Sequence, residues 1–202
     1  MTQKEFYGTF FPNLQETERL LNQLTEQYIK GNSQKAEIQP VAYYSSRIKS
    51  PESMLGKLKR RKLPNDVSVA MKEFYDAVGL RIVCSFVDDV YLIADWLKDR
   101  PELKVVQVKD YIAFPKPNGY RSLHLQAEML MESCAGMHAE IQLRTIAIDF
   151  WATLEHQLKY KQNLPHEDLI RGELKRCADE IAATDLSMQT IRDLISDNFQ
   201  TQ

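Results

Sequence analysis

The feature that most constrains the fold is a series of β-rich segments in the middle of the chain. Residues 80–86 are mostly apolar, and further β-rich or alternating segments lie at 104–109, 122–129 and 138–143. Between the first two segments, residues 88–98 carry apolar side chains at helical spacing. This order predicts a mixed β-sheet flanked by helices, of the α+β class, and it does not have the fixed period of a repeat protein.

A helix is expected before the sheet region, within residues 1–36. Asn13 is its expected cap, and Glu16 stands at the capping-box position three residues later. Gly31 and the two polar residues after it are expected to end the helix. The apolar stripe that would face the domain consists of Leu14, Leu21, Leu24 and Tyr28.

A second terminal helix is expected at residues 166–200. Its apolar or small residues alternate in spacing between four and three, with one polar lapse, which is typical of a heptad pattern. These positions are Ile170, Leu174, Cys177, Ile181, Thr184, Met188, Ile191 and Ile195. The segment either forms a subunit interface or packs on its own domain. The second alternative stays open because the segment is short for a coiled coil.

The bulk properties indicate a single cytoplasmic domain that spans residues 1–202. The chain is 44% apolar and 27% charged, which is ordinary for a globular protein. The N-terminus lacks the basic and apolar regions of a signal peptide, and every apolar run is too short to cross a membrane. The three cysteines are widely separated and lack zinc-site spacing, which argues against disulfides and structural zinc.

A cluster of cations lies between Arg47 and Lys62. Seven basic residues face one acidic residue there, so the segment carries +6, and with a total charge of −2 the remainder carries −8. Ser50, followed by proline and glutamate, predicts a helix that begins within this cluster and runs to about Lys62. The cluster is either a solvated helix face or a local site for a polyanion such as a triphosphate.

Two acidic residues are placed next to predicted strands. Asp76 precedes the first β-rich segment, and Glu140 shares a strand face with Gln142 because side chains two apart point the same way. If these strands are neighbours, Asp76 and Glu140 can converge on one Mg²⁺, which prefers hard oxygen ligands. Taken separately, each acid has the simpler reading of a surface residue or an ion-pair partner.

A stiff loop separates the second and third β-rich segments. Pro115 and Pro117 restrict it, and Asn118 followed by Gly119 is a strong turn signal. Tyr120 follows the turn, where a free ring can stack on a base, an interaction worth roughly 1–3 kcal/mol. Lys116, Arg121 and His124 are placed to meet phosphates, although Asn-Gly alone predicts only a surface turn.

These segments together resemble the synthetase domain of the RelA/SpoT alarmone synthetases, and the short chain is similar to the small, stand-alone members of that family. The resemblance covers about residues 40–161 and rests on six motifs in order. The motifs are Arg47 to Ser53, Asp76 to Arg81, Asp110 to Ile112, Lys116 to His124, Glu140 to Thr145 and Phe150 to His156.

The resemblance implies a nucleotidyltransferase-like fold and Mg²⁺-dependent transfer of the β,γ-pyrophosphate of ATP to the ribose 3′-hydroxyl of GDP or GTP, in the bacterial stringent response. It implies that Asp76 and Glu140 hold the metal and that Glu140 is the base. The residues implied in ATP binding are Arg47, Lys49, Lys57, Arg60 and Arg81. Those implied in acceptor binding are Tyr120 (stacking on guanine), Lys116, His124, Gln142, Lys109 and Asp149, the last an asparagine in some relatives.

Three further expectations concern the whole protein. No histidine is followed by aspartate, so the metal motif of the hydrolase domain in larger relatives is missing and synthesis without degradation is expected. The resemblance implies a homotetramer formed through the terminal helices. The alternatives are a nucleotide- or RNA-binding regulator, which the intact acid pair disfavours, and a tRNA-pyrophosphorylating toxin, which the guanine loop disfavours.

Overall fold

The computed structural model describes residues 1–33, 38–159 and 166–200, except the side chains of residues 159 and 197–200. The strands are β1 (Val41–Ile48), β2 (Val78–Cys84), β3 (Leu103–Asp110), β4 (Leu123–Met129) and β5 (His138–Thr145). The helices are α1 (Gln3–Tyr7), α2 (Phe11–Asn32), α3 (Pro51–Arg60), α4 (Val67–Glu73), α5 (Val87–Lys98), α6 (Ile146–Lys159) and α7 (Glu167–Gln200). Two short 3-10 turns, η1 (Gly8–Phe10) and η2 (Glu132–Cys134), complete the assignment.

The five strands form one mixed sheet in the order β1-β2-β5-β4-β3. β2 and β5 pair in parallel at its centre, and the other three pairings are antiparallel. The four predicted strands are confirmed, and the fold class is the predicted one. Residues 41–48, which lead into the basic cluster and include its first residue Arg47, form β1, an edge strand that pairs with β2.

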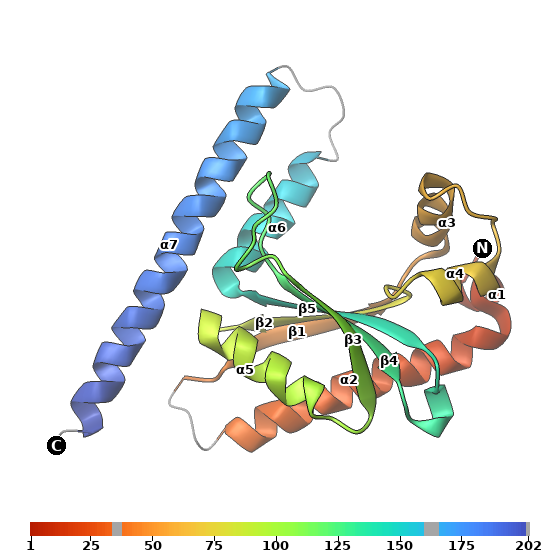
Figure 1. The fold of residues 1–202 in the computed structure, drawn as a ribbon, viewed down its shortest axis with the longest axis horizontal. Helices are drawn as coiled ribbons and strands as arrows, with labels where there is room; N and C mark the ends of the chain where they lie inside the picture. Colours follow the sequence, from red (N-terminus) through yellow and green to blue (C-terminus); the bar gives the residue numbers. More distant parts are fainter. Residues whose placement is uncertain (34–37, 160–165, 201–202) are drawn as a thin grey trace.

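Helices α2 and α5 cover one face of the sheet (Figure 1). The predicted stripe of α2 is buried there, and Leu14, Leu21 and Leu24 have no exposed surface. Along β5, Ala139 and Ile141 are fully buried while Glu140 between them is half-buried, the alternation of a strand with one face on a core. Helices α3 and α6 rise from the opposite face, at its two ends (Figure 1).

The start of the first long helix differs from the prediction. Asn13 is not a cap but lies inside α2, which begins at Phe11 because Pro12 fits the first turn of a helix. A separate short helix, α1, precedes it, and Thr2 caps that helix by accepting a hydrogen bond from the backbone of Glu5. Ser50 caps α3 as predicted, by accepting a hydrogen bond from the backbone N–H of Ser53.

Helix α7 runs along α6 and past α5 at one side of the molecule (Figure 1). In its first half, Ala178 is buried against α6 and the indole N–H of Trp151 donates to the carbonyl of Leu174. Further along, the helix is tied to α5 by an ion pair between Arg192 and Asp88. Its second half exposes apolar side chains, namely Leu186, Met188, Ile191, Leu194 and Ile195.

The interpretation in which the terminal segment packs on its own domain is confirmed for the first half of α7. The half with Leu174 and Ala178 packs on its own domain, whereas the half with the exposed apolar side chains remains uncovered in the single chain. Among the described residues, no helix is both long and apolar enough to cross a membrane.

Candidate active site

The sheet register lines up one residue from each strand on the face opposite α2 and α5. Ser45 of β1 lies opposite Arg81 of β2, Arg81 opposite Gln142 of β5, Gln142 opposite His124 of β4, and His124 opposite Lys109 of β3. Residues opposite one another in paired strands point to the same face. Four of the predicted site residues thus form a single row across the sheet.

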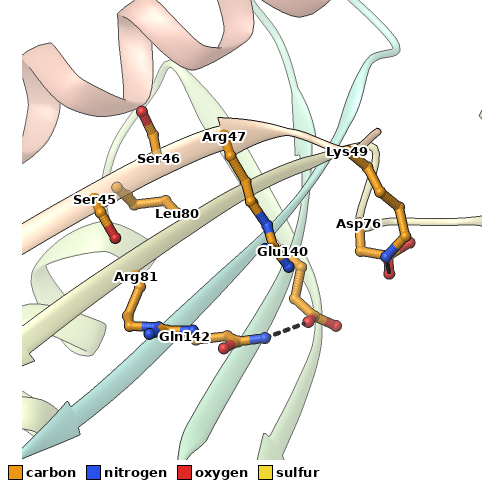
Figure 2. Close-up of a pocket in the computed structure, with 10 residues that line it drawn as sticks. Ser45, Ser46, Arg47, Lys49, Asp76, Leu80, Arg81, Glu140 and Gln142 are labelled. Carbon is orange, nitrogen blue, oxygen red and sulfur yellow. Dashed lines mark hydrogen bonds and ion pairs between the residues drawn. The ribbon is translucent and has the colours of Figure 1, made fainter. Parts of the chain in front are cut away.

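A pocket of about 280 Å³ lies over the β1, β2 and β5 part of this face (Figure 2). It contains six of the predicted residues and exposes mainly polar side chains. Its walls are Ser45, Ser46, Arg47, Lys49, Asp76, Gly79, Leu80, Arg81, Glu140 and Gln142. The predicted meeting of Asp76 and Glu140 is explained by the parallel pairing of β2 with β5, which sets Gly79 opposite Glu140.

Two lysines hold Asp76. Lys49 Nζ donates to Asp76 Oδ2 at 2.8 Å, and Lys57 Nζ donates to Oδ1 at 2.6 Å. Burial raises the pKa of the Asp76 carboxyl, but the two lysine hydrogen bonds and charges outweigh it, and the pKa lies below its usual value. The carboxylate is therefore ionised at neutral pH. Lys57 Nζ also lies 4.4 Å from the centre of the Phe74 ring, a cation–π contact.

The pocket fits a magnesium ion by the chemistry of its donors. Asp76 and Glu140 bring ionised carboxylates to the same pocket, and Mg²⁺ is usually held by one or two carboxylates together with substrate phosphates. Each oxygen of Asp76 accepts a lysine bond and keeps a further lone pair. The described residues contain no cluster of three or more metal-binding side chains, so phosphates would complete such a site.

Two nitrogen atoms lie near one carboxylate oxygen of Glu140, Oε1. Gln142 Nε2 donates to Glu140 Oε1 at 2.9 Å, and His124 Nδ1 lies 3.7 Å from the same oxygen (Figure 2 shows the Gln142 bond). Burial raises the pKa of Glu140, but the nearby imidazole, the Gln142 hydrogen bond and the charge of Lys57 lower it to about 2. Glu140 is thus ionised at neutral pH, and it is a weak base in this arrangement.

Two arginines share the carboxylate of Asp149. Arg144 Nη1 donates to Asp149 Oδ1 at 2.9 Å, and Arg81 Nη1 lies 3.3 Å from that oxygen. The hydroxyl of Tyr43 donates to Oδ2 at 2.9 Å. Burial and repulsion from Arg144 lower the pKa of Arg81, while Asp149 opposes the shift. Two guanidinium groups on one carboxylate leave an excess positive charge on the pocket side of the sheet.

The loop between β3 and β4 is docked on α6 and α7. Tyr120 packs against a small cluster that includes Trp151 and Ala178, and its hydroxyl lies 2.9 Å from His124 Nε2. The sequence suggested a free ring. The Tyr120 ring is instead half-buried, because α7 of the same chain lies against the loop. Lys116 Nζ lies 4.9 Å from the centre of the Tyr120 ring.

Arg121 was expected to meet phosphates, but it contacts the loop and α7 instead. Its guanidinium donates to the carbonyls of Gly119 and Ala178 and pairs with Asp179 at 2.9 Å, so its polar end points at α7. Gly119 has a φ of +86°, and a Cβ there would lie 2.7 Å from the Cβ of Ala178. Glycine is therefore required both by the turn and by the close approach of α7.

The remaining predicted residues lie farther from the pocket. Lys109 is beside His124 in the register, which places it on the acceptor side of the row. Lys57 is not part of the pocket wall, but it donates to Asp76, and its charge lowers the pKa of Glu140. Arg60 is an exposed residue of the last turn of α3 and is not part of the pocket wall.

Sequence reasoning missed Arg144 and the role of α1. Arg144 had a usable signal, because positions 140, 142 and 144 share one face of a strand. Helix α1 supports the pocket from behind: the hydroxyl of Tyr7 donates to the carbonyl of Lys49 at 2.8 Å, and Gln3 Nε2 donates to that of Ile48 at 2.7 Å. A five-residue helix has too short a pattern to reveal such contacts.

Comparison with known proteins agrees with this geometry. A family model described as a region found in RelA / SpoT proteins matches residues 46–164. The GTP pyrophosphokinase YwaC of Bacillus subtilis is 45% identical over 143 residues, which are 69% of this chain and 68% of that protein. The GTP pyrophosphokinase YjbM of the same organism is 37% identical over 158 residues, or 76% of this chain and 72% of that protein.

Solved structures give the same result. The small alarmone synthetase 1 of Bacillus subtilis, bound to its product pppGpp, matches with a TM-score of 0.82 and 31% identity over 93% of this chain and 96% of that one. The small alarmone synthetase 2 of Bacillus subtilis matches with a TM-score of 0.73 and 39% identity over 86% and 93% of the two chains. The chain therefore belongs to the RelA/SpoT family, among its small alarmone synthetases.

Proposed function

We propose that this protein transfers the β,γ-pyrophosphate of ATP to the ribose 3′-hydroxyl of GDP or GTP and so makes ppGpp or pppGpp. The observation that carries the proposal is the meeting of Asp76 and Glu140 in one cation-lined pocket at the centre of the sheet. The relatives named for GTP pyrophosphokinase activity, and the related structures bound to pppGpp and to the ATP analogue AMPCPP, support it.

The donor nucleotide fits the β1, β2 and α3 side of the pocket. Arg47 and Arg81 present planar guanidinium groups there, and Lys49 and Lys57 present compact charges beside Asp76. Such a set holds a triphosphate and offsets the charge that accumulates as the pyrophosphoryl group moves. Arg60, at the end of α3, is proposed to meet the outer end of the triphosphate.

The acceptor nucleotide fits the β5 and β4 side, next to the docked loop. Tyr120 is proposed to stack on guanine, and Lys116, His124, Gln142, Lys109 and Asp149 to surround the rest of the nucleotide. Because the Tyr120 ring already packs beside α7 and has Lys116 Nζ 4.9 Å from its centre, the base is proposed to take the side of the ring that these neighbours leave open. That side must open toward Glu140 for the 3′-hydroxyl to reach the donor phosphate.

Glu140 is proposed to orient the 3′-hydroxyl and to accept its proton. Its pKa of about 2 means that the carboxylate is ionised and ready, but the same donors weaken it as a base. Alignment of the two substrates and charge stabilisation are the other proposed contributions to the rate. A Mg²⁺ ion held by Asp76 and Glu140 would supply charge neutralisation for the phosphates when bound.

The proposal is tested by supplying purified protein with Mg²⁺, ATP and GDP, GTP or GMP in turn. Formation of ppGpp or pppGpp together with AMP is expected, and none should form with Glu140→Val at equal folded content. Absence of any 3′-pyrophosphorylated guanine nucleotide from the parent protein would refute the function. Incubation of product with Mn²⁺ or Mg²⁺ alone tests synthesis without degradation.

The same assay separates the two alternatives. A nucleotide- or RNA-binding regulator would retain labelled RNA or nucleotide and turn over none of it. A toxin relative would transfer label from ATP to bulk tRNA in preference to GDP or GTP. We expect neither result, because both acids of the pair are present in the pocket and the acceptor loop is intact.

We further propose that the protein acts in the cytoplasm as a homotetramer built through its terminal helices. The support is the uncovered apolar surface of α7, with Leu186, Ile191 and Leu194 exposed, and of α6, where Phe150 is 60% exposed. Light scattering during gel filtration should give four times the mass of one chain. Paired changes of Leu186 and Leu194 to serine should reduce that mass, and a monomeric parent protein would contradict the proposal.

A further inference from the structure

Arg144 has no role in the reaction as proposed so far, yet it is placed at the centre of the polar network. It is only 5% exposed, and it lies on the same face of β5 as Glu140 and Gln142. A guanidinium group donates hydrogen bonds and never accepts them. Its neighbours must therefore present acceptors to it, and this requirement sets the direction of every hydrogen bond that begins there.

The first branch runs through Gln142. Arg144 Nη2 donates to Gln142 Oε1 at 3.1 Å, so the amide must turn its Nε2 the other way. That nitrogen donates to Glu140 Oε1 at 2.9 Å. An amide can in principle be flipped, but the flipped form would set Nε2 against the guanidinium and Oε1 against the carboxylate, which are two repulsive contacts.

The second branch runs through Tyr120 and His124. The other hydrogen of Arg144 Nη2 goes to the Tyr120 hydroxyl oxygen at 2.9 Å. The tyrosine proton is then free to point at His124 Nε2, which lies 2.9 Å from that oxygen. In the neutral imidazole, an accepting Nε2 leaves the proton on Nδ1. Nδ1 is the nitrogen that faces Glu140 Oε1, at 3.7 Å.

We propose that Arg144 is a positioning residue that fixes the direction of both branches, so that they converge on Glu140 Oε1 and leave Oε2 to the hydroxyl of the acceptor. The proposal rests on the proposed function only for the identity of that hydroxyl. Among the described residues, Oε1 receives the Gln142 bond and faces His124, and no hydrogen bond reaches Oε2. Asp149 anchors the far side of the guanidinium at 2.9 Å.

Kinetics test this role first. Arg144→Met keeps an unbranched apolar stem, although a shorter one, and removes all donors. Loss of a hydrogen bond from a charged donor costs about 1.5–3 kcal/mol, which corresponds to a fall in kcat of roughly 10- to 100-fold. The KM for ATP should change less than kcat, because Arg144 meets the ATP side only through the Asp149 carboxylate that it shares with Arg81. The matched control is Arg121→Met, which removes an arginine that points at α7 and should alter the acceptor KM without altering kcat.

A double-mutant cycle tests whether Arg144 acts through the tyrosine. Tyr120→Phe removes the hydroxyl and keeps the ring, and it should lower kcat several-fold in the parent protein. In the Arg144→Met background the same change should have almost no further effect, because neighbours in one network are not additive. A kcat for Arg144→Met within twofold of the parent, or equal effects of Tyr120→Phe in both backgrounds, would overturn the proposal.

A spectroscopic measurement covers the case in which Arg144→Met does not fold. The ¹⁵N resonances of the His124 ring, identified by their loss in His124→Asn, report which nitrogen carries the proton. The parent protein should show the Nδ1–H form of the neutral ring, and Tyr120→Phe should shift the population toward Nε2–H. An Nε2–H ring in the parent protein sinks the inference whatever the enzyme assays show. The proposed function, by contrast, fails only if no product forms.

Discussion

The two halves of the site are built in different ways. On the donor side, the charged residues lie on β1, α3 and β2, and Lys49 and Lys57 are held in place by a direct bond to Asp76. On the acceptor side, Tyr120 lies on a loop that depends on a helix more than fifty residues later in the chain for its position. The donor half is thus organised by partly buried ion pairs at the pocket, whereas the acceptor half is organised by docking on α7.

This difference teaches where each half is vulnerable. A change in the donor half acts on charge balance around one carboxylate, so its effect should appear in turnover and in the dependence on Mg²⁺. A change in the acceptor half acts on the fit between a loop and α7, so its effect should appear in the acceptor KM. Four experiments test this division, beginning with the largest expected effect.

The largest effect is expected for Asp76→Asn. This change leaves Lys49 and Lys57 without their shared partner and removes one of the two carboxylates of the pocket. We expect kcat to fall by at least about 100-fold, as for other residues that stabilise transition-state charge, with a higher Mg²⁺ requirement. Steady-state rates over a Mg²⁺ titration measure both. The control is Glu52→Gln, an exposed acid of α3, which should change neither.

The second effect concerns the acceptor half alone. Tyr120→Ala should raise the acceptor KM by about tenfold or more, given roughly 1–3 kcal/mol for stacking of a base on an aromatic ring. The KM for ATP should not change. Phe114→Ala provides the control, because Phe114 belongs to the same loop and is 79% exposed. An acceptor KM that is the same for Tyr120→Ala and the parent protein would refute the stacking role.

The third experiment separates turn strain from docking on α7. Gly119→Ala and Gly136→Ala both place a side chain at positive φ, at a cost of about 1–2 kcal/mol, but only the first meets Ala178. Gly119→Ala should therefore lower the Tm more than Gly136→Ala and raise the acceptor KM several-fold. Calorimetry and kinetics on the matched pair give both quantities. Equal values for the two variants would show that the loop does not need α7.

The smallest effect is the pH dependence of stability. The pKa of Glu140 is about 2 in the folded protein, below its ordinary 4.5, so its stabilising contribution is complete above pH 4.5 and disappears as the pH falls toward 2. The difference in unfolding free energy between the parent and Glu140→Gln should shrink over that range. Asp185, whose pKa burial raises, should give the opposite slope in Asp185→Asn. Urea titrations at several pH values measure both slopes.

Much of the fold could be predicted because its signals are local. The alternation of β5 and the periodic stripe of α2 each follow from a buried face, and both are confirmed. Short helices such as α1 and α4 were not predicted, because five to seven residues are too few to show a periodic pattern of apolar side chains. The cap predicted at Asn13 shows the same limit, because Pro12 fits the first turn and α2 begins at Phe11, three residues before the expected first helical residue Leu14.

The sequence predicted which residues line the site, but it did not predict which contacts they make with one another. Alternation along β5 and the position of Asp76 before β2 indicated the acid pair, and the register confirmed that the strands are neighbours. The docking of the loop on α7 was not predictable, because nothing local distinguishes a helix that packs on its own domain from one that packs on another copy. Arg121 was assigned to phosphates for the same reason, although it faces Asp179.

The parallel pairing of β2 with β5 also has a consequence for how the protein acquires activity. The two strands are separated in sequence by α5, β3 and β4, so their contact closes a long loop. Such a contact is expected to form late, because contacts between residues far apart in the sequence form after local contacts. Asp76 and Glu140 meet only through that pairing. Recovery of enzyme activity during refolding should therefore report the last step of sheet assembly, after the β3–β4 hairpin and the helices have formed.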